Sequence, residues 1–241
     1  MQREAGRKRL RRVTIAGAVA ATAVGAWGVA MTPLLDVDRV VVTGATQTGA
    51  QAVQLATHVH HGDPMITLHL GAAAQRVAAL PWVRTVDVTR TWPGTVRVHI
   101  VERVPAAATP ARTGWVLVDA DGRELATVPS PPAGLLHVEL PPINAEPGKS
   151  VGADARQALT LAATIPPSLR SRIVALRPAG DGSIDGTVVL RNGAQANLLL
   201  GAPAQADAKW LAVLTVLDAA DPANLAQIDV RVPSAPALTR H

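Results

Sequence analysis

Residues 83–104, VRTVDVTRTWPGTVRVHIVERV, contain two runs in which apolar and polar residues alternate. The first run has valines at positions 86 and 88, and the second has apolar residues at 96, 98 and 100. Alternation with a period of two is typical of a strand that buries one face. Pro93-Gly94 lies between the runs and favours a turn. The stretch therefore predicts a β-hairpin with one apolar and one polar face.

Three further elements are predicted before this hairpin. The β-branched run Val40-Val41-Val42, closed by Gly44, indicates a short strand. Two helices are predicted by apolar residues that recur at i, i+3, i+4 and i+7. They are Ala52, Leu55, Ala56 and Val59 in the first helix, and Leu70, Ala73, Ala74 and Val77 in the second. Residues 35–104 should thus form one small β-α-α-β-β domain.

The chain after this domain reads as short strands and turns with a few helices, over residues 105–232. One hairpin is predicted around the turn at 119–122, and a second is joined by Asn192-Gly193. Helices are expected over 154–165 and around Trp210. The proline-rich residues 129–147 predict an edge strand, because proline cannot donate to a ladder. A last strand is expected at 226–232, followed by a flexible C-terminal tail at 233–241.

Working outward to the other end, the chain begins with a basic tail and a long uncharged run. Six of the first twelve residues are Arg or Lys, and residues 13–35 carry no charge. At 1.5 Å per residue, such a run can cross a hydrocarbon core of about 30 Å. Basic residues flanking a span stay in the cytoplasm. We expect residues 1–12 to be a cytoplasmic basic tail and 13–34 a single transmembrane helix, with the bulk of the chain extracytoplasmic in the cytoplasmic (inner) membrane.

A cleaved signal peptide is the alternative to a retained anchor. It would also have a basic start and an apolar stretch, and Gly28 and Ala30 offer a small-x-small cleavage site. The uncharged run is longer than the ~7–15 residues usual for such a peptide, and it contains Trp27. The anchor is favoured, and a secreted form released after Ala30 stays open.

Charge and composition exclude several classes of function. Outside residues 1–12 the chain carries equal numbers of basic and acidic residues, so a nucleic-acid-binding face is not indicated. No cysteine is present, which excludes disulfides and thiolate metal sites. His58, His60 and His61 cluster near a predicted helix end, where histidines are favourable on dipole grounds without a metal. We predict no catalytic, cofactor-binding or metal-binding residues and no small-molecule substrate.

Several short motifs together carry a resemblance to a known family. They are Val37-x-x-Val40-x-Val42-x-Gly44, Leu80-Pro81-Trp82-Val83, Trp92-Pro93-Gly94, Val101-Glu102-Arg103-x-Pro105, Leu200-Gly201, Lys209 before an apolar helix, and Ile228-Asp229-Val230-Arg231. In this order and spacing they resemble the FtsQ/DivIB family of bacterial cell division proteins, whose first extracytoplasmic domain is of the POTRA type. The fold class expected is α+β: one N-terminal transmembrane helix, a POTRA-like domain and a β-rich domain with flanking helices.

The resemblance implies a non-enzymatic divisome protein that scaffolds the division site and links early components to septal wall-synthesis proteins. Its implied partners are FtsB/DivIC-like and FtsL-like bitopic proteins and, indirectly, the FtsW–FtsI synthase complex. Partner binding is implied for Ile228, Asp229, Val230 and Arg231, in a last strand expected at a sheet edge. Val232-Pro233-Ser234-Ala235-Pro236 departs from the family pattern, in which an aromatic residue and a small loop are usual. The alternative is a membrane-anchored or secreted enzyme that acts on the cell wall.

Overall fold

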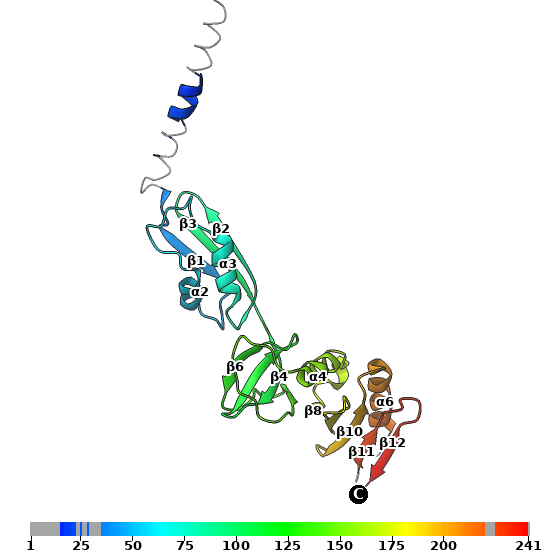
Figure 1. Cartoon of the computed structure of the whole chain (residues 1–241). Coiled ribbons are helices and arrows are strands. Elements are labelled where there is room, and N and C mark those ends of the chain that lie inside the picture. Colours follow the sequence, from blue (N-terminus) through cyan, green and yellow to red (C-terminus); the bar gives the residue numbers. More distant parts are fainter. Residues whose placement is uncertain (1–14, 23–24, 26–27, 29–34, 220–224, 241) are drawn as a thin grey trace, which may run out of the picture. The chain divides into compact units, whose positions relative to one another are not determined.

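The computed structural model describes residues 15–22, 25, 28, 35–219 and 225–240. Residues 15–22 are helical (Figure 1). Among the described residues no helix is both long and apolar enough to cross a membrane. The predicted cytoplasmic tail at 1–12 and most of the predicted span at 13–34 lie outside the described residues. The chain divides into two compact units, Met1–Glu102 and Arg103–His241.

From residue 35 onward the first unit is a three-stranded sheet with two helices, and its order β-α-α-β-β is the predicted one. Its elements are β1 (Arg39–Thr43), α2 (Ala50–Thr57), α3 (Leu70–Ala78), β2 (Val83–Thr91) and β3 (Thr95–Glu102). The sheet order is β1-β3-β2, with β1 parallel and β2 antiparallel to β3. The central strand β3 follows the predicted alternation, because residues 96, 98 and 100 are buried and their neighbours 97, 99 and 101 are exposed.

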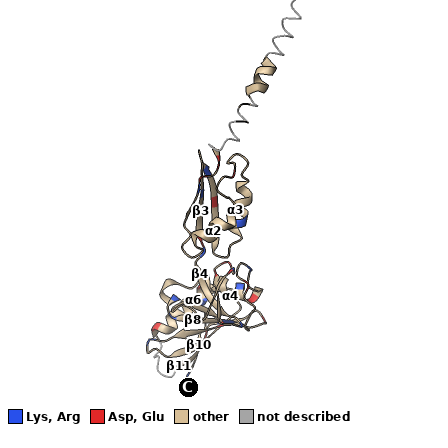
Figure 2. Cartoon of the chain, turned by 90° about the vertical axis from the view of Figure 1, so that its left-hand side faces the viewer, with Lys and Arg blue, Asp and Glu red and all other residues tan. Residues whose placement is uncertain are grey.

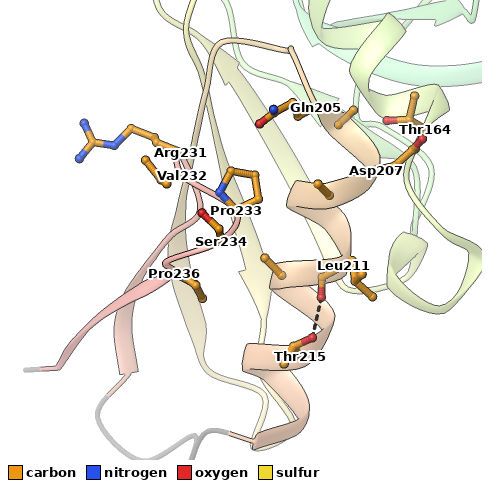
Figure 3. Close-up of a pocket in the computed structure, with 13 residues that line it drawn as sticks. Thr164, Gln205, Asp207, Leu211, Thr215, Arg231, Val232, Pro233, Ser234 and Pro236 are labelled. Atoms are coloured by element: carbon orange, nitrogen blue, oxygen red, sulfur yellow. Dashed lines mark hydrogen bonds between the residues drawn. The ribbon is translucent and has the colours of Figure 1, made fainter.

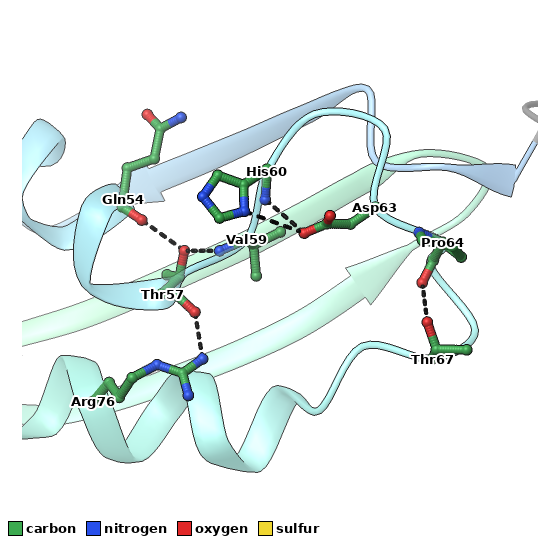
Figure 4. Close-up of polar contacts among 8 residues, drawn as sticks. All are labelled: Gln54, Thr57, Val59, His60, Asp63, Pro64, Thr67 and Arg76. Carbon is green, nitrogen blue, oxygen red and sulfur yellow. Dashed lines mark hydrogen bonds and ion pairs between the residues drawn. The ribbon is translucent and has the colours of Figure 1, made fainter.

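The predicted buried face of the first helix is correct in part: Val59 is buried and Ala56 packs against the core, but Ala52 and Leu55 are exposed. Leu55 is 68% exposed, whereas Val53 and Thr57 are fully buried. The helix has only eight residues and ends where His58 adopts a left-handed conformation (φ 53°), so Val59 lies beyond it. Figure 4 shows how Thr57 is accommodated: its hydroxyl donates to the Gln54 carbonyl (2.6 Å) and accepts from the Val59 amide (3.1 Å). The helix is thus rotated relative to the face that the spacing predicted.

The second unit is a nine-stranded sheet with helices packed against it. Its elements are β4 (Pro105–Pro110), β5 (Trp115–Asp119), β6 (Glu124–Val128), β7 (Leu136–Val138), α4 (Ala153–Ala163), α5 (Pro167–Arg170), β8 (Ile173–Pro178), β9 (Ile184–Val189), β10 (Gln195–Gly201), α6 (Ala206–Ala219), β11 (Leu225–Asp229) and β12 (Ala237–Arg240). Both predicted hairpins are present, as β5–β6 and β9–β10. The sheet order is β12-β11-β10-β9-β8-β7-β4-β5-β6.

Two predictions about strands in this sheet are wrong. The proline-rich region contributes β7, which is an interior strand that pairs in parallel with both β4 and β8. Its three residues contain no proline, so the prolines around it interrupt no ladder bond. The predicted flexible tail at 233–241 contains β12, which pairs antiparallel with β11. The strand predicted as the last is therefore not the edge strand.

One apolar core fills the second unit. It combines residues of α4, the sheet and α6, and Trp210 of α6 is its largest fully buried side chain. The indole nitrogen of Trp210 donates to the Thr164 hydroxyl (2.8 Å), which links α6 to the end of α4. Charged residues of both signs are interspersed along the two units in the view of Figure 2. This fits the equal numbers of acidic and basic residues after the basic tail.

Candidate partner-binding edge

The predicted partner-binding segment 228–231 has one buried and one exposed face. Ile228 and Val230 are fully buried in the core. The Val230 amide donates to the Leu199 carbonyl (2.9 Å), which extends the contact between β10 and β11 beyond the end of β11. Asp229 and Arg231 lie on the opposite face, as expected from the period of two. Of the four predicted residues, only these two have side chains that can meet a partner without disturbing the core.

Asp229 and Arg231 form a close ion pair with each other. The Arg231 Nη2 donates to Asp229 Oδ2 (2.7 Å), and the backbone amide of Arg231 donates to Asp229 Oδ1 (3.0 Å). The hydrogen bonds from the Arg231 side chain hold the pKa of Asp229 below its ordinary value, although partial burial works the other way. The same pair raises the pKa of Arg231. Both groups are therefore charged at neutral pH and fixed in one geometry.

The backbone beneath Arg231 leaves room for its side chain. Gly201 at the end of β10 has φ 65°, and a Cβ there would lie 3.0 Å from the Arg231 Cγ. The stem of Arg231 thus passes over a position that has no side chain. Gly201 fits both needs, since glycine tolerates positive φ and close approach. The Leu200-Gly201 motif and the 228–231 motif are brought together here.

Lys209, the third motif residue of this region, is a buried cation. It is 3% exposed, and its Nζ donates to the carbonyls of Leu200 (2.6 Å) and Ala202. Burial lowers its pKa. Lys209 therefore fixes the chain between β10 and α6, next to the Gly201–Arg231 contact. The sequence motif includes this lysine. Its burial could not be predicted from the spacing of apolar residues, because α6 is apolar on most of its surface.

An open groove borders the ion pair, with a volume of about 1070 Å³ (Figure 3). One wall is the outer side of α6, where Leu211 is 64% exposed. The other wall is the segment 231–236, with Val232 59% exposed and Pro233 and Pro236 beside it. The lining is mainly apolar. The proline segment, which departs from the family pattern, thus forms one side of a groove.

Beyond this groove β12 forms the end of the sheet. It pairs on one side with β11, in a register that places Asp229 opposite Ala237 and Gln227 opposite Thr239. All four residues of β12 are exposed. A strand at an edge presents backbone groups that can pair with a strand from another chain. The sequence predicted this property for β11; in the structure β12 has it.

The motif Glu102-Arg103 joins the two units, and each residue is bound within its own unit. The Glu102 carboxylate accepts the backbone amides of Gln47 (2.9 Å) and Thr48 (2.6 Å). Burial pushes the pKa of Glu102 upward, but these hydrogen bonds together outweigh it, so the pKa lies below its ordinary value. Arg103 pairs with Asp119 and Asp121 in the β5–β6 turn. A charged side chain at the end of a strand can simply point into solvent, but both of these side chains have partners in the protein.

The histidine cluster, His58, His60 and His61, lies in the first unit. It forms no metal-binding group with the other residues that the structure describes. His60 approaches Asp63 (Nδ1 to Oδ2, 3.7 Å), and the His60 amide donates to the same oxygen (2.8 Å; Figure 4). Within the described ranges, no three His, Asp or Glu side chains are grouped so that they could hold a metal ion. The contacts of His60 are those of an ordinary turn.

Comparison with known proteins accounts for both units. Residues 35–103 match the family model of the FtsQ-type POTRA domain, and residues 108–231 match that of the cell division protein FtsQ/DivIB C-terminal domain. The cell division protein FtsQ of Streptomyces collinus is 29% identical over 244 residues, covering 98% of this chain and 90% of that protein. That of Streptomyces griseus is 28% identical, covering 85% of this chain and 97% of that protein.

FtsQ of Corynebacterium glutamicum is 35% identical over 120 residues, and this match covers 50% of the chain and 52% of that protein. The chain thus spans about half the length of some of the relatives that it matches. The two family models together cover residues 35–103 and 108–231, and the second alone matches about half of the chain. The chain therefore belongs to the FtsQ/DivIB family of cell division proteins.

Proposed function

We propose that this protein is a non-enzymatic scaffold of the divisome, held in the cytoplasmic membrane at the division septum. One N-terminal span crosses the membrane with residues 1–12 in the cytoplasm, and the chain from residue 35 onward lies outside. The protein links early division components to the septal wall-synthesis proteins. Its direct partners are FtsB/DivIC-like and FtsL-like bitopic proteins, and the FtsW–FtsI synthase complex is an indirect one.

The proposal for partner binding rests on one observation above all: β12 ends the nine-stranded sheet with four exposed residues beside the fixed pair Asp229–Arg231. A partner strand pairs with the free backbone of β12, which supplies affinity but little specificity. The ion pair supplies charge complementarity and fixes the register. Ile228 and Val230 contribute by holding the backbone of this segment in the core.

Proline residues limit the contact to a short segment. Pro233 and Pro236 lie just before β12 and lack backbone N–H groups, so they cannot extend a ladder. The apolar groove beside them accepts apolar side chains of the partner in place of the missing aromatic anchor. No arrangement among the described residues favours the wall-acting enzyme that the sequence left open, and we do not propose it.

Arg231→Glu tests the docking assignment. The exposed side chain leaves the core untouched, so the amide exchange of β10 and β11 should not change. Binding of the purified FtsB/DivIC-like partner to the full-length protein in detergent should weaken about tenfold, or ~1.4 kcal/mol. Arg191→Glu is the matched control, because Arg191 is equally exposed (60% against 61%) and also pairs with an aspartate, Asp218. Unchanged partner binding with an intact fold would contradict the assignment.

Retention in the membrane tests the anchor. The mature protein should stay in the membrane fraction through an alkaline wash, with residues after about 35 open to protease from outside, because one span of this length inserts stably. A soluble form that begins near Met31 would show that the segment is a cleaved signal peptide.

A further inference from the structure

The tip of the β2–β3 hairpin is attached to the residues through which the chain enters the first unit. The backbone amides of Asp38 and Arg39 both donate to the Gly94 carbonyl, at 2.7 and 3.2 Å. A Cβ on Gly94 would lie 2.8 Å from the carbonyl oxygen of Asp36 and 2.1 Å from the carboxylate of Asp38. The tip is therefore packed directly on residues 36–39.

A second loop is attached to the same entry segment. The Met65 amide donates to the Leu35 carbonyl (3.0 Å), and the Val37 amide donates to the Asp63 carbonyl (2.8 Å). Figure 4 shows the turn of this loop, closed by the Thr67 hydroxyl on the Pro64 carbonyl (3.1 Å). The loop 62–67 and the hairpin tip thus both contact residues 35–39.

Each of these two attached segments exposes one large apolar side chain. Trp92 on the hairpin tip is 52% exposed, and Ile66 on the loop is 44% exposed. Ile66 directly follows Met65, which is fully buried. Trp92 lies two residues before Gly94, which is closely packed. Tryptophan is enriched at membrane interfaces, where its ring lies at the level of the headgroups.

Chain length places this end of the unit close to the membrane. The span of the proposed function ends at residue 34, and the two residues to Asp36 can cover at most about 7 Å. The headgroup layer on each side of the hydrocarbon core is roughly 5–7 Å thick. Asp36, and with it the tip that contacts it, therefore lies at or within this layer.

We propose that Trp92 and Ile66 insert into the headgroup layer of the outer leaflet and hold the first unit against the membrane. The proposal rests on the membrane span of the proposed function. The charged side chains of the segments 35–39, 60–67 and 89–97 balance: Asp36, Asp38 and Asp63 against Arg39, Arg90 and Arg97. Since this end has no net charge, insertion is driven by apolar area and needs no anionic lipid.

The test uses tryptophan fluorescence of the full-length protein in phosphatidylcholine vesicles whose acyl chains carry bromine. Bromine near the headgroups should quench Trp92, and bromine near the bilayer centre should quench Trp27 in the span. Trp92→Phe should remove about half of the quenching by shallow bromine and little of that by deep bromine, because an interfacial ring lies at headgroup depth. Trp82→Phe is the control, because Trp82 adjoins the opposite end of β2 and should leave both unchanged.

The two ways in which the proposal can fail are distinct. If deep quenching depends on Trp27 and shallow quenching is the same in Trp92→Phe, the span is correct and Trp92 only shapes its turn. If Trp27→Phe leaves deep quenching unchanged, the span is wrong, and the membrane contact of the tip is overturned with it. Replacing part of the phosphatidylcholine with phosphatidylglycerol should not change the shallow quenching; a strong increase would overturn apolar insertion in favour of electrostatic attraction.

Discussion

The two edges of the nine-stranded sheet are built differently. At the β6 edge the segment 146–150 lies beside the start of the strand. The Gly148 amide donates to the Glu124 carbonyl (2.7 Å), and the Glu124 amide donates to the Lys149 carbonyl (2.8 Å). The buried carboxylate of Glu124 also accepts the Glu146 amide (2.6 Å). At the other edge, all four residues of β12 are exposed, and the strand pairs along one side with β11.

This difference shows how one sheet can discourage pairing at one edge and favour it at the other. Exposed edges invite association with other chains, and proteins commonly blunt them by covering or shortening them. The start of β6 is covered, and Pro129 follows its end. β12 is also short and prolines precede it, but among the described residues no segment pairs with its outer side. Within the nine-stranded sheet, the exposed edge at β12, next to the Asp229–Arg231 pair, is therefore the one proposed to accept a partner strand.

The largest expected effect is at the covered edge. Glu124→Ala removes a buried acceptor and leaves the Glu146 amide without its partner, which should destabilise this part of the second unit by about 2–3 kcal/mol. Faster amide exchange over residues 122–128 and 146–151 would report it. Glu139→Ala is the control: that carboxylate pairs with Arg177 at the surface, and its loss should cost less than about 1 kcal/mol. Equal effects of both changes would mean that Glu124 does not hold the cover in place.

Removal of the open edge should leave the fold intact. Deletion of residues 237–241 takes away the exposed side chains of β12 and its ladder with β11 but no residue of the core, so the exchange protection of β9 and β10 should change by less than about 1 kcal/mol. Partner binding should weaken more than about tenfold, because the outermost backbone moves inward by one strand spacing of roughly 4.8 Å. Loss of protection throughout the sheet would show that β12 is a structural strand and that its edge has no separate role.

The smallest effect concerns pH. The pKa of Asp229 is lowered in the folded protein, so the stability that its pair with Arg231 contributes is complete above the unfolded value of about 3.9 and is lost as the pH falls through the lowered pKa. Partner binding should therefore be flat from about pH 5 to 8 and weaken only in stronger acid. Asp229→Asn should remove this acid dependence. A change of affinity near pH 6.5 would instead point to a histidine.

The alternating strands were predictable from sequence, and the helix face was predictable only in part. Burial in β3 follows the period of two directly, since residues 96, 98 and 100 all point into the core. For α2 the spacing predicted Leu55 as buried, but the residue is exposed. The helix ends after eight residues at a left-handed His58, so the assumed fourth contact at Val59 belongs to the following turn. A short helix gives periodicity too few residues to fix its rotation.

The order of the strands in the sheet was harder to predict than their positions along the chain. β7 and β12 have three and four residues and lie among prolines, which favoured an edge strand and a flexible tail. Their places in the sheet depend on pairing with strands distant in sequence, as in β7 with β8, and local patterns do not report such pairing. β8 was not predicted at all, because its residues IVALRP show no clear alternation.

The candidate site was predicted in part for the same reason. Alternation correctly separated Ile228 and Val230 from Asp229 and Arg231, because it needs only local geometry. The edge position was assigned to the wrong strand, since that depended on whether 237–240 pairs with β11. The role of Lys209 beneath the site follows from its bonds to carbonyls of the β10–α6 connection, which spacing alone does not reveal.

Photo-crosslinking in growing cells tests the central claim most directly, because it compares the two edges in the same protein. A photoreactive residue is placed either at Thr239 in β12 or at Thr127 in β6, both of which are exposed. We expect Thr239 to crosslink to an FtsB/DivIC-like partner, with Arg231→Glu reducing the yield, and Thr127 to give no such product. Crosslinks to this partner from Thr127, or none from Thr239 while the partner still co-purifies, would contradict the assignment of β12 as the docking edge.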